Sequence, residues 1–279
     1  MQNLVLYKAN EVESSSCQWD VLPAKMCTLL SQKNLLYAVL NNPTVIMKKT
    51  FLLLFTLLLS HSLLGQDEKG KTEFSVINIL GAKVYEQPTF ASKVLTEIPN
   101  GGIIQPERSI ETNEAFAIGK GFFLSGKWIK PMDINGFVFS SDLSSKKVET
   151  GTSDYGQEYI NLLGELISEQ SEEKKIKTEI GEFPQYCEYK YYENGKYSLT
   201  IWDGCFDHMT EYQNLTLNEV YHQMVSDYGL LMNGKDFLVP EFQEKAGNIL
   251  KFEGLDATQD LKIELKENGI FVVTSYSCD

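Results

Sequence analysis

Histidine and the common catalytic signatures are scarce in this sequence. Three of its 279 residues are histidine, and it contains no Gly-rich phosphate loop, no Gly-x-Ser-x-Gly and no His-Glu-x-x-His. These sequences mark P-loop nucleotide hydrolases, hydrolases built on a nucleophile elbow, and zincin metalloproteases, respectively. Their absence argues against all three classes.

Basic residues are also few. The chain has 25 Lys and Arg against 38 Asp and Glu, a formal net charge of −13 at pH 7. A surface this acidic repels the phosphate backbone of nucleic acids and the anionic face of a membrane. We therefore expect no nucleic-acid partner.

No apolar run in the sequence is long enough to span a bilayer. The longest covers Phe51 to Leu59, and its extension to Leu64 still falls short of the roughly 20 residues that a span needs. Two lysines precede this run, and Gly65 ends it before a polar stretch. This three-part pattern predicts a secretory signal peptide over residues 47–65, cut before Gln66. Because Gln66 stands where a lipoprotein needs Cys, we expect no lipid anchor.

The predicted signal does not begin the sequence. Residues 1–46 precede it and show no sustained hydrophobic period. We interpret them as an over-extended start or a disordered segment, with translation beginning at Met47. The alternative is a cytoplasmic tail before a short signal anchor. In the first case the protein is exported to the periplasm or outside the cell, with no stable membrane span after cleavage.

Short apolar runs separated by Gly, Pro and Asn follow the signal. Such spacing predicts a small β-barrel over residues 74–143. The runs are Phe74–Leu80, Lys83–Tyr85, Lys93–Ile98, Gly102–Gln105, Phe122–Leu124, Trp128–Lys130 and Phe137–Phe139.

The order of landmarks in this stretch resembles the bacterial SH3-like (SH3b) domains. The matching pieces are Ala82–Tyr85 with Pro88, Ser92–Leu95, Ile98–Gly101, Lys127–Lys130, and Gly136–Val138 with Ser141 and Leu143. The resemblance implies an SH3-like barrel that binds peptides or cell-wall fragments in a groove between loops.

By the same resemblance, the groove candidates are Tyr85, Phe90 and Trp128. The chain departs from the family pattern between Gln105 and Lys127, where it is longer. We expect the additional residues, Glu107 to Gly121, to cover or reshape the groove.

The sequence changes character after the predicted barrel. Residues 144–154 are small and polar, which predicts a linker. Residues 155–279 then form a predicted α+β domain, beginning with an amphipathic helix whose apolar residues recur at helical spacing. These residues are Tyr159, Ile160, Leu162, Leu163, Leu166 and Ile167.

Two hairpins and a second helix are predicted in this domain. Asn194-Gly195 and Asn268-Gly269 each join two β-rich runs, and a type I′ turn at Asn194-Gly195 would pair Tyr191 with Ser198. Thr216 and Glu219 form a capping box that predicts a helix start.

Three cysteines follow the predicted signal, which in an exported chain indicates one disulfide and one leftover thiol. They are Cys187, Cys205 and Cys278. A regular strand register places Cys187 and Cys205 on opposite faces. If the two hairpins pair side by side, Cys205 and Cys278 lie at equivalent strand ends, so we favour a Cys205–Cys278 bridge.

Two chemical hypotheses centre on Cys205. With His208 it could form a nucleophile pair, but its surroundings do not match the Asp-Cys-Ser-Gly signature of papain-like wall peptidases. With His208, Asp203, Asp207 and His222 it could hold zinc, yet no second closely spaced ligand pair is present. A bridged Cys205 beside a surface histidine explains the pattern better.

The predicted fold class is therefore mainly β plus α+β: a small SH3-like barrel followed by an α+β domain with two Asn-Gly hairpins. The predicted function is non-catalytic binding of a peptide, a peptidoglycan fragment or an envelope protein, without metal or cofactor. One alternative is a cell-envelope hydrolase with the barrel as its targeting module. Another is a structural or inhibitory partner that uses its second domain as the interaction surface.

Overall fold

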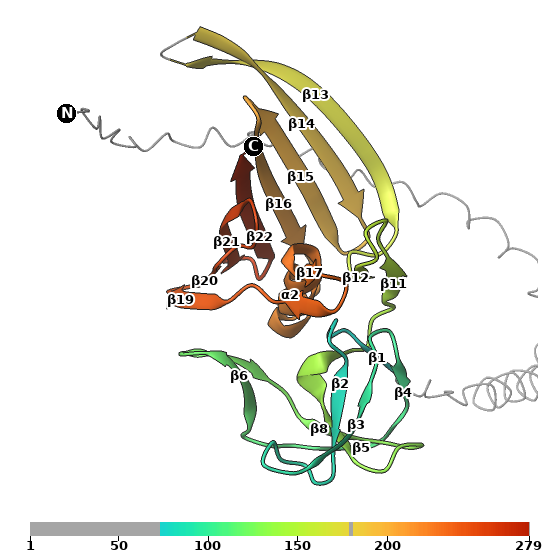
Figure 1. Cartoon of the computed structure of the whole chain (residues 1–279). Helices are drawn as coiled ribbons and strands as arrows, with labels where there is room; N and C mark the ends of the chain where they lie inside the picture. The colour runs from blue at the N-terminus through green and yellow to red at the C-terminus, as the bar shows by residue number, and fades with distance from the viewer. Residues whose placement is uncertain (1–72, 179–180, 279) are drawn as a thin grey trace, which may run out of the picture. The chain divides into compact units, whose positions relative to one another are not determined.

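The computed structural model describes residues 73–178 and 181–278, which belong to one compact unit (Figure 1). The predictions for residues 1–46 and for the signal at 47–65 lie outside the described residues. Within the described part, no helix is both long and apolar enough to cross a membrane.

Two small antiparallel sheets enclose the first core. One has the strand order β10-β1-β4, and the other has the order β3-β2-β9-β8-β5. Their bounds are β1 Phe74–Val76, β2 Ala82–Tyr85, β3 Val94–Ile98, β4 Ile103–Ile104, β5 Pro106–Ile110, β8 Trp128–Pro131, β9 Phe137–Phe139 and β10 Leu143–Ser144. The strands β1, β3, β4 and β9 fall within the predicted runs, and β2 and β8 extend theirs by one residue. Buried Val76, Val84, Ile104 and Val138 fill the space between the sheets.

The segment Glu107–Gly121 contributes most of one further strand and all of another. The first, β5, pairs with β8 and extends the five-stranded sheet. The second, β6 (Ala115–Gly119), forms a separate hairpin with β7 (Phe122–Ser125). The apolar pattern of this segment is weak because β5 carries Glu107, Arg108 and Ser109 at the sheet edge, where their side chains reach solvent.

Most of the remaining chain forms one antiparallel sheet of eight strands. Its order is β13-β14-β15-β16-β22-β21-β20-β19, so β13 and β19 are the edges (Figure 1). The bounds are β13 Leu166–Thr178, β14 Gly181–Tyr192, β15 Gly195–Trp202, β16 Cys205–Tyr212, β19 Phe242–Ala246, β20 Ile249–Phe252, β21 Thr258–Leu265 and β22 Phe271–Cys278. Two ribbons accompany it, β11 (Glu149–Thr152) with β12 (Glu158–Asn161) and β17 (Leu230–Met232) with β18 (Asp236–Leu238).

The predicted helix over residues 155–167 is wrong, and with it the α+β class of the second half. This stretch contains β12 and the start of β13, and the described residues are mostly β, with α2 (Leu217–Tyr228) as their one α-helix. The burial explains the error. Ile160 and Leu162 are buried while Tyr159 and Ile167 are exposed, which is the alternation of a strand rather than a helical stripe. Gly164, at φ +79°, then turns the chain.

The helix predicted from the capping box is confirmed. Thr216 is the N-cap of α2: its hydroxyl accepts from the backbone N–H of Glu219, and the Glu219 carboxylate accepts from the backbone N–H of Thr216 at 2.7 Å. Gly229 is the C-cap, and its N–H donates to the carbonyl oxygen of Val225. Glu219 also accepts a hydrogen bond from Ser144 Oγ, at the end of β10.

The second core lies beneath α2 and includes residues from the first part of the chain. Val220, Met224 and Val225 of the helix pack with residues of β20 to β22 and with Ile77 and Phe122. The predicted linker at 144–154 therefore joins segments whose side chains share a core. The division into domains at 144–154 stays a prediction.

The Asn-Gly hairpin has a different register from the predicted one. Tyr192 pairs with Gly195 and Tyr189 with Ser198, so the loop is Glu193-Asn194. The turn with two positive φ angles lies one hairpin further on, at Asp203 (φ 49°) and Gly204 (φ 76°). This is the type I′ pattern. It pairs Trp202 with Cys205 and resets the alternation, so Cys205 points to the same face as Cys187, not the opposite one.

The predicted disulfide is confirmed. Cys205 and Cys278 are directly opposite each other on neighbouring strands β16 and β22, and they are bridged. Cys187 is the free cysteine of the described residues, and it is buried. Disulfides of this kind persist in oxidising compartments.

Candidate functional site

The three groove candidates of the barrel form one aromatic cluster. The Phe90 ring contacts those of Tyr85 and Trp128, with centroids 5.8 and 4.9 Å away, and the Tyr85 and Trp128 rings contact each other at 5.3 Å. The Trp128 side chain is fully buried, and Tyr85 is 8% exposed. Glu114, from the additional segment, accepts hydrogen bonds from Trp128 Nε1 at 2.9 Å and from Thr89 Oγ1 at 2.7 Å. The additional segment thus covers the position where the resemblance implies a groove, and a ligand-binding role for these residues stays a prediction.

An apolar pocket lies on the other side of the additional segment. The ring of Phe116 contacts Phe90 at 5.7 Å, and 40% of Phe116 remains exposed. The pocket measures about 430 Å³ and is lined by Phe116, Ala117, Ile118, Tyr221, Val239, Pro240, Glu241 and Phe242.

The cysteine and histidine residues do not form a nucleophile pair. Cys205 is oxidised, so it supplies neither a thiolate nor a zinc ligand. Cys187 lies on the face opposite to His208, because its cross-strand partner is Thr200 whereas that of His208 is Leu199. In the described ranges, no group of three or more His, Cys, Asp or Glu side chains has the arrangement of a metal site.

His222 is a buried residue whose contacts are structural. It lies in α2, is 3% exposed, and places its Nε2 3.4 Å from the Asp142 carboxylate. Asn78 Nδ2 donates to the same carboxylate at 3.2 Å. These contacts connect α2 to the end of the barrel.

A different set of side chains gathers on one face of the eight-stranded sheet. Cross-strand partners share a face, and alternate residues of a strand point to opposite faces. The pairs Lys190–Tyr197 and Leu199–His208 therefore lie on the same side. We call this surface the tyrosine face; it consists of Tyr186, Glu188, Lys190, Tyr192, Tyr197, Leu199, Phe206 and His208, all of them partly or largely exposed.

The helix α2 packs on the same side of the sheet and borders the tyrosine face. Ser275 Oγ of β22 donates to the Tyr228 hydroxyl at 3.1 Å, and the Tyr212 hydroxyl donates to Asp227 at 3.4 Å. Gln223 Nε2 donates to the other oxygen of Asp227 at 2.9 Å. The helix covers the sheet from β16 towards β20, whereas β14 and β15 lie beyond it (Figure 1).

Polar contacts hold the tyrosine face in a defined arrangement. The Tyr197 hydroxyl is hydrogen-bonded to His208 Nδ1 at 2.9 Å, and Lys190 Nζ lies 2.5 Å from a Glu188 oxygen. Burial, with a smaller contribution from Glu188, raises the pKa of Tyr197 to about 12. Burial lowers the pKa of His208, so this imidazole is more readily neutral than a free histidine. Near pH 7 the Tyr192 and Tyr197 hydroxyls are therefore neutral, because burial raises the pKa of both, and Lys190 forms an ion pair with Glu188 within the face.

Asp227, at the border of this face, gives a pH-dependent prediction. Burial raises the pKa of its carboxyl to about 7, and hydrogen bonds from Gln223 and Tyr212 oppose the shift. Part of the Asp227 side chain is nevertheless exposed, and solvent screens the effect of burial, so the folded-state pKa lies above the usual value of about 4 and no higher than about 7.

A raised folded-state pKa means that the folded protein holds the proton more tightly than the unfolded chain. The resulting stabilisation is complete below the unfolded pKa of about 4 and is lost as pH rises towards 7. We expect wild type to lose stability relative to Asp227→Asn over this range, as measured by urea midpoints between pH 4 and 8. A difference between the two proteins that does not change with pH would contradict the raised pKa.

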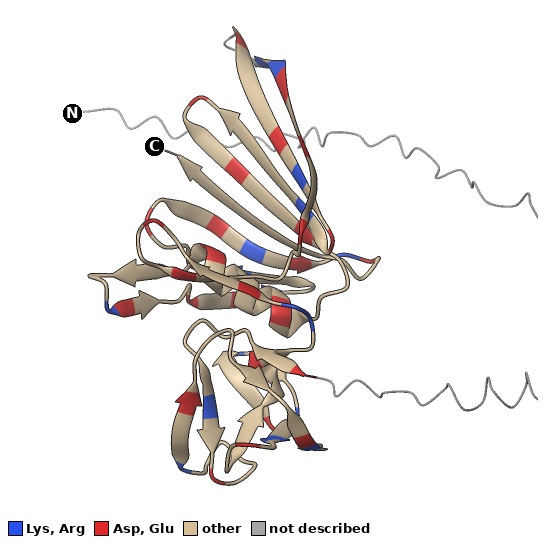
Figure 2. Cartoon of the chain, turned by 90° about the vertical axis from the view of Figure 1, so that its right-hand side faces the viewer, with Lys and Arg blue, Asp and Glu red and all other residues tan. Residues whose placement is uncertain are grey.

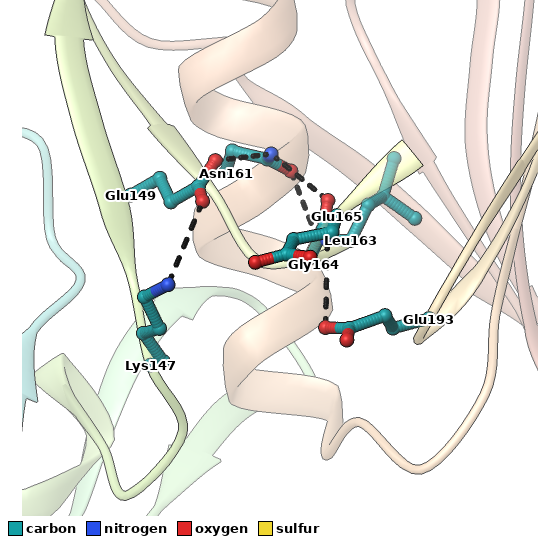
Figure 3. A network of polar contacts seen from close by, with 7 residues as sticks. All are labelled: Lys147, Glu149, Asn161, Leu163, Gly164, Glu165 and Glu193. Carbon is teal, nitrogen blue, oxygen red and sulfur yellow. Dashed lines mark hydrogen bonds and ion pairs between the residues drawn. The ribbon is translucent and has the colours of Figure 1, made fainter. Parts of the chain in front are cut away.

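A second polar cluster lies where the chain leaves the barrel (Figure 3). Asn161 Nδ2 donates to Glu149 and to the carbonyl oxygen of Gly164, each at 3.4 Å, and Glu149 lies 4.0 Å from Lys147. The backbone N–H of Glu165 donates to Glu193. A pocket of about 230 Å³ adjoins this cluster. Because the contacts connect the 146–149 segment to two turns, we assign the cluster a structural role.

The distribution of acidic residues does not identify the tyrosine face. Figure 2 shows Asp and Glu on strands, turns and the helix alike, rather than in a single patch. The sequence did contain a signal for the tyrosine face, namely aromatic or charged residues at every second position from Tyr186 to Tyr192. It could not be interpreted without knowing which side of the sheet α2 occupies.

Comparison with known proteins adds no family. No protein-family model matches the chain, and no curated protein or solved structure shows significant similarity to it.

Proposed function

We propose that this is an exported, non-catalytic binding protein that holds a peptide, a cell-wall fragment or a partner protein on the tyrosine face. The observation that carries the proposal is that one face of β14 and β15, beside the end of α2, presents the exposed Tyr186 and the partly exposed Tyr192 and Tyr197. Tyrosine rings give large contact area at low entropic cost, and their hydroxyls can pair with the polar groups of peptides or sugars. The resemblance of the barrel to SH3b domains supports the same ligand classes.

The test uses the full chain made in an exporting host, with insoluble peptidoglycan and an immobilised peptide library as probes. We expect at least one probe to retain the protein, and Tyr186→Ala/Tyr192→Ala to weaken binding at least tenfold. Tyr191→Ala is the matched control, because it removes a tyrosine from the same strand on the opposite face.

Three results would contradict the proposal. The first is failure of both probes to retain the wild type, and the second is an equal loss of binding in the Tyr191 control. The third is release of soluble fragments from peptidoglycan, which would show hydrolysis instead of binding.

A further inference from the structure

The edge strand β13 is unusually open for association. It runs for 13 residues, Leu166–Thr178, whereas strands average five or six. Natural sheet edges are kept short or carry charged residues, proline or bulges, because an open edge presents unpaired N–H and C=O groups. Of these devices, β13 has the charged residues along its length. No proline occurs in β13, and its register shift lies at one end, between Leu166 and Ser168. The strand therefore offers a long regular edge.

The charges of β13 are divided along its length. Its acidic residues, Glu169, Glu172 and Glu173, all precede its basic residues, Lys174, Lys175 and Lys177. A parallel copy would place like charges together, whereas an antiparallel copy places the acidic half beside the basic half. Like charges directly opposite each other are destabilising, and opposite charges are favourable. The arrangement of acidic and basic residues along β13 therefore favours antiparallel over parallel pairing with a second β13 strand.

We propose that β13 pairs antiparallel with β13 of a second copy, forming a two-fold symmetric dimer with a sheet continuous across the interface.

Symmetry fixes the register of this dimer. A two-fold axis perpendicular to the sheet keeps each face continuous, so opposite residues must belong to the same face of the strand. A register centred on Glu173 satisfies this condition. It places Glu169 opposite Lys177 and Glu172 opposite Lys174, each pair twice. Glu172 and Lys174 are partly exposed and already form an ion pair within the strand, so the second copy would extend it to four charges.

The register has one unfavourable contact, which makes it testable. Glu173 faces its own copy on the axis, with Lys175 of each copy as the diagonal neighbour. Replacement of this carboxylate by an amide removes the like-charge contact without changing the shape of the side chain. We therefore expect Glu173→Gln to tighten the dimer, the opposite effect to losing a favourable pair.

Sedimentation equilibrium of the full chain at low ionic strength tests the interface. We expect a dimer for wild type and at least tenfold weaker association for an acidic edge, Lys174→Glu/Lys177→Glu, and for a basic edge, Glu169→Lys/Glu172→Lys. An equimolar mixture of the two edges should restore the dimer. The control is Lys235→Glu/Lys245→Glu, which changes the net charge by the same amount as the acidic edge variant, at exposed positions outside β13.

The outcomes separate clearly. A restored mixed dimer together with a tighter Glu173→Gln dimer supports the pairing and its register. A monomeric wild type at several hundred micromolar would overturn the proposal. So would a dimer that neither edge variant weakens, or a control that dissociates as the edge variants do. Circular dichroism of each variant confirms that a lost dimer is not a lost fold.

Discussion

Replacing both Cys205 and Cys278 by serine is expected to lower the free energy of unfolding by about 4 kcal/mol. The bridge joins residues 73 positions apart, and closing a loop of that length removes much of the conformational entropy of the unfolded chain. For a protein of this size, the loss corresponds to a fall in melting temperature of roughly 10 °C. Urea unfolding at neutral pH, with and without reductant, measures it.

The reductant supplies the control for this experiment. Wild type treated with reductant should approach the stability of the serine variant, and the variant itself should not respond. Cys187 is present in both proteins, so its buried thiol does not contribute to the difference. A variant within about 1 kcal/mol of wild type would show that the bridge does not constrain the unfolded chain as this account requires.

The bridge also bears on the proposed binding surface. Cys205 precedes Phe206 of the tyrosine face, and Cys278 follows Ser277, the cross-strand partner of Phe206. The disulfide therefore closes the end of the β16–β22 pair at the border of that face. Loss of the bridge should fray this end first, which hydrogen exchange of the Phe206 amide would report.

The local part of the fold was predictable from the sequence, and the reasons are visible in particular residues. Most barrel strands, though not β5 and β10, were predicted because each is short, β-rich and bounded by turn residues. The capping box at Thr216 was found because its chemistry is contained in four residues. The disulfide was predicted from the expectation that the two Asn-Gly hairpins pair side by side. In the sheet, β16 lies between those hairpins, and it is β16 that pairs with β22 and places Cys205 opposite Cys278.

The failures were cases in which tertiary packing decided between two local patterns. Residues 159–167 contain apolar residues at helical spacing, but only alternate ones, Ile160 and Leu162, are buried in the core beneath α2, and Leu163 packs against that core while partly exposed. A short apolar run cannot by itself distinguish a helix from a buried strand. The candidate site was missed for the same reason. The exposed side of β14 and β15 depends on where α2 packs, and the groove candidates of the barrel were covered by Glu114 from a segment with a weak apolar pattern.

Gly195 was predicted to be needed for a positive φ angle in the hairpin turn, but the structure requires glycine there for another reason. The Asn194-Gly195 dipeptide predicted a hairpin, and a hairpin is present, but Gly195 does not have a positive φ angle. Glycine is required at this position because there is no room for a side chain. A Cβ at this position would overlap the backbone carbonyl oxygen of Glu211 and lie 2.9 Å from Leu163 Cδ2. Neither the paired strand β16 nor the buried backbone can shift at low cost.

We therefore expect Gly195→Ala to lower the free energy of unfolding by about 3 kcal/mol, as overpacking against backbone does. Gly204→Ala is the matched control at the next turn: its φ is +76°, yet a Cβ there has nothing within 4 Å. Backbone strain alone should cost about 1 kcal/mol in that variant. Urea unfolding of both variants shows whether close packing or a positive φ angle makes glycine necessary in these hairpins. If Gly204→Ala were the more destabilised, positive φ rather than close packing would limit the hairpins of this sheet.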